Sequence, residues 1–232
     1  MKVFSIEHST LNIDSGPFLY PIIDTGLCRA RALDPVSVAE ACLAGGARIL
    51  QLRDKDGASG VFLALAETMV QRARTVNGLV VVNDRADIAQ LSGAGGVHVG
   101  QDDLSPADVR RIVGLGSVVG VSTHDEQQID AALDTDATYV AVGPIFGTAT
   151  KDTGYSARGL DLIRYAANRG KPIVAIGGIA LDRVESVLEA GAAGLAVISD
   201  LLTTGNPEAR TREYMARLAG TQGPFCGIMP PL

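Results

Sequence analysis

The stretch Ala190-Gly191-Ala192-Ala193-Gly194-Leu195-Ala196-Val197-Ile198-Ser199 decides the fold, because a turn of small residues leads directly into a short apolar run. Glycine can end a helix in the left-handed conformation just before the next strand begins. A short apolar run after such a turn is typical of a strand that is buried on both faces of a parallel sheet. The stretch therefore predicts one helix–turn–strand unit of an α/β protein.

The same pattern recurs along the whole chain. Small-residue turns also occur at residues 44–47 and 93–96. Apolar runs predict strands at residues 18–23, 49–52, 79–82, 97–99, 118–121, 139–142, 173–176 and 195–198. Helical patterns lie between them, at residues 35–43, 62–74, 106–113, 126–133, 160–168, 181–189 and 207–218.

An alternation that continues to an eighth strand predicts a closed (β/α)8 TIM barrel in a single α/β domain. An open doubly wound sheet is the alternative, but no GxGxxG follows the first strand. We expect an N-terminal extension over residues 1–16, the barrel catalytic domain over residues 17–220, and a C-terminal tail over residues 221–232.

Composition excludes several classes of protein. The chain of 232 residues has a net charge of -6, which argues against a nucleic-acid surface. No apolar run approaches the roughly 20 residues of a membrane span, and the N-terminus lacks a signal-peptide pattern. We expect a cytoplasmic protein without membrane or nucleic-acid partners, compatible with a homo-oligomer. The three cysteines, Cys28, Cys42 and Cys226, are widely spaced, which indicates isolated thiols.

Polar residues cluster where the predicted strands end, the face that carries the active site of a TIM barrel. In Gln51-Leu52-Arg53-Asp54-Lys55, alternation along the strand points Gln51, Arg53 and Lys55 to one side. These three donors could converge on one anion. For Lys55 alone, a solvated cation with a buried aliphatic stem is the alternative.

Carboxylates follow the next two predicted strands. Asn83 and Asp84 come after the third strand, and Asp103 comes after the fourth. Hard oxygen ligands on neighbouring strand ends, beside cations, suit a Mg²⁺ ion that bridges phosphate groups. The alternative is that Asp84 and Asp103 cap the helices that follow.

Hydroxyl groups and glycines follow the later strands. After the fifth, Ser122 is a candidate site residue, whereas Thr123 has the spacing of a helix cap because Glu126 lies three residues on. The loop after the sixth strand contains Thr148, Thr150 and Lys151, which suit an anionic oxygen.

After the last two strands, Gly177, Gly178 and Ser199 are typical of a phosphate cradle built from backbone N–H groups. A tight turn alone would explain one of the two glycines, but less readily both of them together with Ser199. His124 lies at a predicted helix start, where a histidine is more often structural.

With these residues in view, the chain resembles the thiamine-phosphate synthase family. The resemblance covers residues 19–202 and rests on an ordered set of motifs: QLRDK (51–55), VVNDR (81–85), GVHVGQDDL (96–104), GVSTH (120–124), VGPIFGTATK (142–151), AIGGI (175–179) and AVIS (196–199). One departure is Gly147, where the family usually has proline; glycine widens the allowed backbone conformations of this loop.

The resemblance implies a Mg²⁺-dependent transferase that couples 4-amino-2-methyl-5-hydroxymethylpyrimidine diphosphate with a thiazole phosphate, through a carbocation-like alkyl transfer that releases diphosphate. It implies contacts to the pyrimidine diphosphate from Gln51, Arg53, Lys55, Asn83, Ser122 and Lys151. Arg53, Lys55, Lys151 and Ser122 would be the catalytic residues, and Asp84 and Asp103 the metal ligands. The thiazole phosphate would contact Thr148, Thr150, Gly178, Ile198 and Ser199.

Two other functions are compatible with the same barrel. A thiazole tautomerase needs a general base near the thiazole, and its relatives place a histidine where this chain has Gly143-Pro144-Ile145. A non-catalytic thiamine-phosphate binding protein would not need the intact set of Arg53, Lys55, Asp84 and Asp103. Both considerations favour the synthase.

Overall fold

The computed structural model describes residues 16–147 and 154–221 and has the predicted closed barrel of parallel strands. Each strand pairs with the next, and β1 closes on β8 with Phe18 opposite Gly194 and Pro21 opposite Val197. The strands are β1 Phe18–Asp24, β2 Ile49–Arg53, β3 Leu79–Asn83, β4 Gly96–Val99, β5 Val118–Thr123, β6 Tyr139–Val142, β7 Ile173–Ile176 and β8 Gly194–Val197. All of the predicted strands are confirmed.

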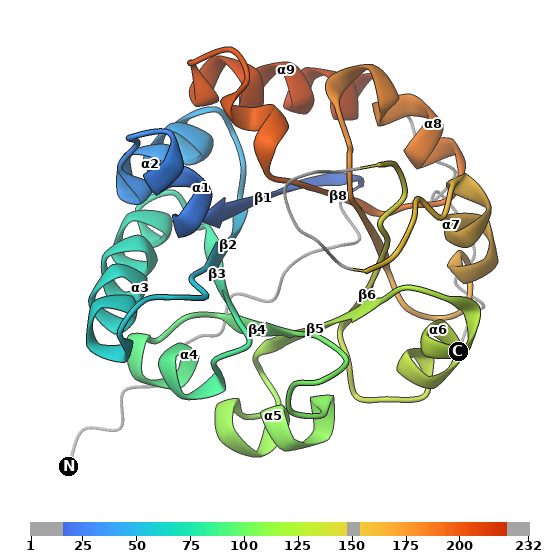
Figure 1. Ribbon diagram of the computed structural model, residues 1–232, viewed down its shortest axis with the longest axis horizontal. Coiled ribbons are helices and arrows are strands. Elements are labelled where there is room, and N and C mark those ends of the chain that lie inside the picture. Colours follow the sequence, from blue (N-terminus) through green and yellow to red (C-terminus); the bar gives the residue numbers. More distant parts are fainter. Residues whose placement is uncertain (1–15, 148–153, 222–232) are drawn as a thin grey trace, which may run out of the picture.

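The helices form an outer ring around the strands (Figure 1). They are α1 Thr25–Ala30, α2 Pro35–Ala44, α3 Ser59–Arg74, α4 Ala86–Ser92, α5 Pro106–Val113, α6 Glu126–Leu133, α7 Leu160–Ala166, α8 Val184–Glu189 and α9 Pro207–Gly220, with 3-10 turns η2 Leu181–Arg183 and η3 Ser199–Leu202. The helix predicted over residues 181–189 therefore begins as a 3-10 turn, and α1 and α4 were not predicted.

Three helices begin at a proline that follows a capping side chain. Asp34, Ser105 and Asn206 accept hydrogen bonds from backbone N–H groups at the start of α2, α5 and α9. Proline fits the first helical position because its missing N–H would have no partner inside the helix. A capping residue followed by proline therefore determines where each of these three helices begins.

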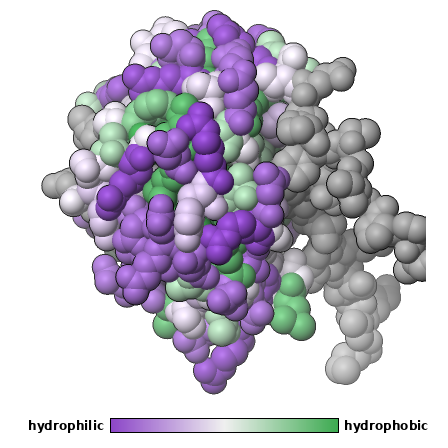
Figure 2. All heavy atoms as spheres, turned by 90° about the vertical axis from the view of Figure 1, so that its right-hand side faces the viewer, coloured by the Kyte–Doolittle hydropathy of each residue, from purple (hydrophilic) through white to green (hydrophobic). Residues whose placement is uncertain are grey.

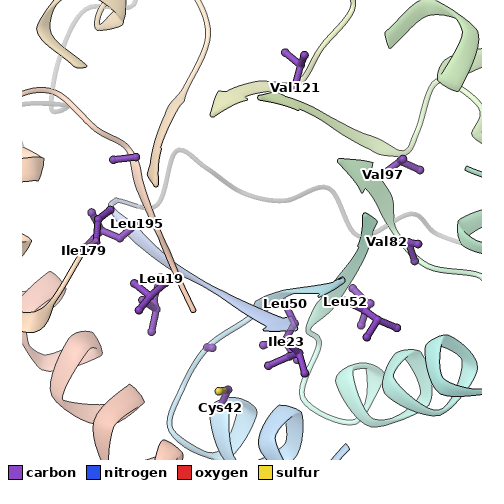
Figure 3. Packing of buried hydrophobic residues seen from close by; sticks show 14 of the residues in the cluster. Leu19, Ile23, Cys42, Leu50, Leu52, Val82, Val97, Val121, Ile179 and Leu195 are labelled. Atoms are coloured by element: carbon purple, nitrogen blue, oxygen red, sulfur yellow. The ribbon is translucent and has the colours of Figure 1, made fainter. Parts of the chain in front are cut away.

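Two apolar layers stabilise the barrel. One lies between strands and helices, and Figure 3 shows part of it, including Ile23, Leu50 and Cys42. The other fills the barrel interior and includes Tyr20, Val81 and Tyr139. Packing on both faces explains why the strands are almost continuously apolar.

The outer surface is mostly hydrophilic on the face that Figure 2 shows. Within residues 16–147 and 154–221, we find no helix with both the length and the apolar character that a membrane crossing requires. Cys28 and Cys42 are buried free thiols, as predicted, and Cys226 lies outside the described residues.

Candidate active site

The predicted site residues lie at the carboxyl ends of the strands. Gln51 and Arg53 belong to β2, Asn83 ends β3, and Ser122 belongs to β5. Ile198 and Ser199 directly follow β8. Thr148, Thr150 and Lys151 lie outside the described residues. The barrel therefore gathers residues from distant parts of the sequence at one face.

The three donors of β2 and its loop have three different partners in this structure. The Gln51 amide is buried and donates to the Tyr20 hydroxyl at 3.1 Å. The Arg53 guanidinium pairs with Asp24, and the Lys55 ammonium pairs with Asp84 at 2.5 Å. Each of the two cations thus has its own carboxylate, and the convergence of the three donors on one anion stays a prediction.

Asp24 is a site residue that sequence reasoning missed. It is the last residue of β1, opposite Arg53 in the register of β1 and β2. One carboxylate oxygen contacts Arg53, and the other accepts the backbone N–H of Leu27 at 2.8 Å, which caps α1. Asp24 therefore orients the Arg53 guanidinium while it fixes the start of the first helix.

The backbone at Asp84 has a left-handed conformation, with φ of 62°. Its N–H donates to the carbonyl oxygen of His98 at 2.7 Å, which ties the loop after β3 to β4. Asp84 does not cap α4, whose preceding residue is Arg85 and which has no side-chain cap. The alternative of a capping role is therefore wrong, and the Asp84 carboxylate lies beside Lys55 instead.

Asp103 does not cap a helix either. Ser105 caps α5 by accepting the N–H of Asp108. One oxygen of Asp103 accepts the N–H of Gly100 at 2.8 Å, so the loop after β4 folds back on this carboxylate. Asp84 and Asp103 thus follow the neighbouring strands β3 and β4. Lys55 pairs with the Asp84 carboxylate, and the backbone N–H of Gly100 donates to the Asp103 carboxylate.

These two carboxylates suit Mg²⁺ better than a metal that needs an all-protein cage. Among the residues that the structure describes, no group of three or more His, Cys, Asp or Glu side chains could bind a metal ion. Mg²⁺ is usually held by one or two carboxylates, with waters and substrate phosphates as its other ligands. The donor set at this face fits such an ion.

Ser122 lies at the end of a buried hydrogen-bonded series. Its hydroxyl is 2.8 Å from Nε2 of His98, and its carbonyl oxygen accepts the side-chain amide of Gln101. The neighbouring Thr123 is fully buried and donates to the carbonyl oxygen of Ala141. The prediction that Thr123 caps the next helix is wrong, because Asp125 caps α6.

The loop after β6 is attached to the loop after β5. Nδ1 of His124 lies 2.5 Å from the carbonyl oxygen of Gly143, and its ring stacks on Tyr155 with centroids 4.4 Å apart. The Tyr155 hydroxyl accepts a hydrogen bond from Gln128 at 3.3 Å. His124 therefore contacts Gly143 and Tyr155, and a structural role for it stays a prediction.

Both glycines after β7 are needed by the polypeptide itself. Gly177 and Gly178 have φ of 97° and 62°. A Cβ atom on Gly177 would lie 2.6 Å from Cα of Pro144, and one on Gly178 would lie 2.5 Å from the carbonyl oxygen of Gly147. Turn geometry and close backbone approach thus explain both glycines, whereas the sequence suggested that a tight turn would explain only one of them.

Arg183 joins the loops after β6 and β7, a role that the sequence did not reveal. Its guanidinium donates to the carbonyl oxygen of Gly178 at 2.6 Å and lies 4.3 Å from the ring centroid of Phe146. A cation above an aromatic face is attracted to it electrostatically. This contact positions the backbone of the candidate cradle.

The 3-10 turn that begins at Ser199 is anchored to α9. Asp200 accepts two hydrogen bonds from Arg210, at 3.0 and 3.1 Å, and one from the Tyr214 hydroxyl at 2.5 Å. Burial and the neighbouring Asp200 raise the pKa of Tyr214, so it stays a donor. Sequence reasoning missed this anchor because its members lie on different elements.

The family model and the curated relatives of this chain point to one family. The family model described as thiamine monophosphate synthase matches residues 19–201. A thiamine-phosphate synthase of Roseiflexus sp. (strain RS-1) is 41% identical over 205 residues, which are 88% of this chain and 86% of the relative. One from Thermus thermophilus is 44% identical over 183 residues, 78% of this chain and 87% of the relative.

A solved structure gives the same result. The thiamine phosphate pyrophosphorylase from Pyrococcus furiosus superposes with a TM-score of 0.82 at 28% sequence identity. The match covers 91% of this chain and all of the other, 100%. Similarity therefore extends over the barrel and all of the strand ends described above.

Proposed function

We propose how the active site works in this chain, which belongs to the thiamine monophosphate synthase family. The family model matches residues 19–201, and two relatives are 41% and 44% identical to the chain. Its function is that of a thiamine-phosphate synthase, a transferase of thiamine biosynthesis. The two substrates are the aminopyrimidine diphosphate and the thiazole phosphate, and the products are thiamine phosphate and diphosphate.

The diphosphate lies over β2 and β3. The observation that carries this assignment is the pair of Lys55 and Asp84, which come from neighbouring strand ends and lie 2.5 Å apart. A diphosphate would take Lys55 as a partner and leave Asp84 to a metal ion. Arg53 and Lys151 complete the cationic surroundings, while Gln51, Asn83 and Ser122 contact the pyrimidine ring.

Asp84 and Asp103 would hold Mg²⁺. When bound, the ion neutralises negative charge on the diphosphate and so makes it a better leaving group. The hydrogen bond from the Asp84 N–H to the His98 carbonyl oxygen fixes the backbone at Asp84, and the N–H of Gly100 orients the Asp103 carboxylate. The donor set and its placement support Mg²⁺ over a metal that prefers nitrogen or sulfur ligands.

The reaction is an alkyl transfer in which no protein nucleophile takes part. The bond between the pyrimidine methylene carbon and the diphosphate oxygen breaks, and its electron pair leaves with diphosphate. The positive charge that develops on the methylene is delocalised into the electron-rich aminopyrimidine. The thiazole nitrogen then donates its electron pair to this carbon. Arg53, Lys55 and Lys151 stabilise the departing charge.

The thiazole phosphate lies at the ends of β6, β7 and β8. Gly178, Ile198 and Ser199 bind its phosphate, and Thr148 and Thr150 contact the thiazole. The anchoring of Gly178 by Arg183 and of η3 by Arg210 supports this assignment, because a preorganised backbone binds an anion without reorganising. The two substrates are thus positioned for bond formation between the early and late strands.

A substitution at Asp84 tests the proposal. Asparagine suits the left-handed backbone at this position, so Asp84→Asn removes charge without straining the loop. We expect turnover to fall by roughly 100-fold or more, as for loss of one electrostatic transition-state contact, with a higher Mg²⁺ requirement. Asp87→Asn is the matched control, because Asp87 is an exposed carboxylate on α4 paired with Arg85.

The readout is release of diphosphate and formation of thiamine phosphate at a series of Mg²⁺ concentrations. Equal activity and equal metal dependence in Asp84→Asn and the parent protein would refute the metal assignment. Absence of product from the parent protein with both substrates and Mg²⁺ would refute the reaction itself.

A further inference from the structure

Five polar side chains inside the barrel form one continuous hydrogen-bonded series, which we call the interior network. It runs from Gln51 to Tyr20 at 3.1 Å, to Tyr139 at 3.0 Å, to Nδ1 of His98 at 2.9 Å, and from Nε2 of His98 to Ser122 at 2.8 Å. Its two ends are the pyrimidine contacts of the proposed function. The three residues between them have no assigned role.

Packing fixes the positions of the three middle residues. Tyr20 and Tyr139 are each 1% exposed, and their rings meet edge to face with centroids 5.9 Å apart. The His98 ring stacks on Tyr139 at 5.7 Å. Gly120 makes room for the Tyr139 ring, since a Cβ atom there would lie 2.1 Å from Cζ of Tyr139. The network is therefore a rigid part of the barrel interior.

Each tyrosine contributes one hydrogen to this network. Burial raises the pKa of Tyr20 and of Tyr139 above the ordinary value, so both hydroxyls stay protonated. A buried hydroxyl that donates to no acceptor is rare in proteins. The direction of the hydrogen bonds can therefore be worked out by placing each hydrogen in turn.

With the Gln51 amide oriented as it is in this structure, the series has one direction that satisfies every hydroxyl. The Gln51 amide nitrogen donates to Tyr20, so the Tyr20 hydrogen must go to Tyr139. The Tyr139 hydrogen then goes to Nδ1 of His98, whose proton is on Nε2 and is donated to Ser122. If Tyr139 donated to Tyr20 instead, the Tyr20 hydrogen would have no acceptor among the described residues.

This direction determines what the two ends offer to a ligand. Ser122 already accepts from His98, so its own hydrogen is available for donation. Gln51 already donates to Tyr20, so its carbonyl oxygen is available for acceptance. If the Gln51 amide were flipped, every hydrogen bond of the network would run in the opposite direction, and the His98 proton would be on Nδ1. Gln51 would then donate to the ligand, and Ser122 would accept from it.

We infer that Tyr20, Tyr139 and His98 are positioning residues that set the hydrogen-bonding polarity of Gln51 and Ser122, so that the site selects a pyrimidine with an amino donor beside a ring-nitrogen acceptor. The inference rests on the proposed function for the identity of the ligand. A 4-oxo pyrimidine, with a ring N–H donor beside a carbonyl acceptor, has the opposite polarity. A site built to pair with one pattern rejects the other, because buried polar groups lose their partners.

The direction of the network can be measured in the protein without substrate. Long-range ¹H–¹⁵N NMR of the histidine rings, assigned with a His124→Gln variant and a His8→Gln variant, reports which nitrogen of His98 carries the proton. We expect the proton on Nε2 alone. A proton on Nδ1, or on both nitrogens, would overturn the inference.

Selectivity supplies the second test. We expect the parent protein to bind the 4-amino pyrimidine diphosphate at least about tenfold more tightly than its 4-oxo analogue, a difference typical of one or two well-made hydrogen bonds. Tyr139→Phe breaks the network between Tyr20 and His98 and should bring this ratio toward one. It should raise KM for the pyrimidine substrate while KM for the thiazole phosphate is unchanged.

Thr123→Val is the matched control, because it removes a buried hydroxyl of the same strand that lies outside the network. We expect it to keep the full ratio. An unchanged ratio in Tyr139→Phe would overturn the inference, and if that variant does not fold, the NMR measurement on the parent protein decides alone. Turnover without the Nε2 tautomer refutes the network but leaves the synthase function intact. The Nε2 tautomer without turnover of the aminopyrimidine would refute the synthase function but leave the network intact.

Discussion

Arg53 and Asp24 form an ion pair in which the Asp24 carboxylate has two structural roles. Asp24 orients the guanidinium and also caps α1 through Leu27. Asparagine keeps the capping oxygen but removes the charge, whereas alanine removes both. We expect Asp24→Ala to lower the free energy of unfolding by about 1 kcal/mol more than Asp24→Asn does, the usual contribution of a helix cap.

The two variants should differ in stability but have similar activity. Both lose the carboxylate that orients Arg53, so both should show a similar fall in kcat/KM for the pyrimidine diphosphate. Urea unfolding and steady-state kinetics check the two effects. Equal stability of the two variants would exclude the cap, and parent-like kinetics in both would exclude a positioning role for Asp24.

Gly120 shows how a single missing side chain shapes the interior. Alanine at this position would place a Cβ atom 2.1 Å from the Tyr139 ring, so the ring must shift. Overpacking of this kind costs about 1–3 kcal/mol, and we expect Gly120→Ala to destabilise the barrel by that amount. Binding of the pyrimidine substrate should weaken as well.

Gly60→Ala is the matched control for Gly120→Ala. Gly60 lies in α3, and a Cβ atom added there has no neighbour within 4 Å. Alanine should stabilise the protein by about 0.4–1 kcal/mol, because it restricts the unfolded chain. Denaturant unfolding of both variants compares the two glycines, and similar changes of the same sign would contradict the packing argument.

At the scale of elements, α9 fixes the short turn η3 at the end of β8. Arg210 and Asp200 are only 16% and 13% exposed in their side chains, and their two hydrogen bonds anchor the residue next to Ser199. We expect Arg210→Met to raise KM for the thiazole phosphate and to cost about 1–3 kcal/mol of stability, since Asp200 loses a charged partner. KM for the pyrimidine diphosphate should change little.

Arg212→Met is the control for this anchor. Arg212 lies on the same helix, but its side chain is 62% exposed and pairs with Glu208 on the surface. Such pairs contribute about 0–1 kcal/mol, so stability and both KM values should stay near those of the parent protein. If Arg210→Met behaved like Arg212→Met, the anchor would have no role in phosphate binding.

The elements that could be predicted are those with a strong local pattern. Buried parallel strands give uninterrupted apolar runs, which is why β7 was predicted with the observed bounds and β3 was predicted only one residue too short. The helices α1 and α4 are short and follow strands directly, so neither has room for a clear amphipathic period. Asp24 caps α1 locally, whereas α4 has no side-chain cap.

At the scale of the whole molecule, closure of the barrel creates contacts that no local pattern contains. Gln51 and Ser122 were predicted because they interrupt apolar strands at the expected face. Tyr20 and Tyr139 lie in predicted strands without any pattern that marks them as site residues. Their hydroxyls meet across 119 residues of sequence only because the barrel brings their strands together. The polarity of the site therefore depends on the fold as a whole.

Burial of ionisable groups gives the whole barrel a characteristic pH dependence. Burial raises the pKa of the Cys28 and Cys42 thiols to about 11, and it also raises the pKa of Tyr20 and Tyr139. In the unfolded chain these groups release their protons near pH 8.5 and pH 10 respectively, approximately. The folded state keeps them, so it binds more protons than the unfolded state at alkaline pH.

The sign of the effect follows from this difference. The contribution of these groups to the free energy of unfolding is fully present below about pH 8.5. It falls by about 1.4 kcal/mol per pH unit for each group, between the pKa of that group in the unfolded chain and its pKa in the folded protein. We expect the free energy of unfolding in urea to fall from pH 9 to pH 10 through the thiols, and more steeply above pH 10 as the tyrosines join. Cys42→Ala should flatten the first part of this curve, and Tyr20→Phe only the second, whatever each costs in packing at neutral pH. A curve that stayed level to pH 11, or that Cys42→Ala left unchanged in slope, would mean that these groups ionise as readily inside the folded barrel as in the unfolded chain.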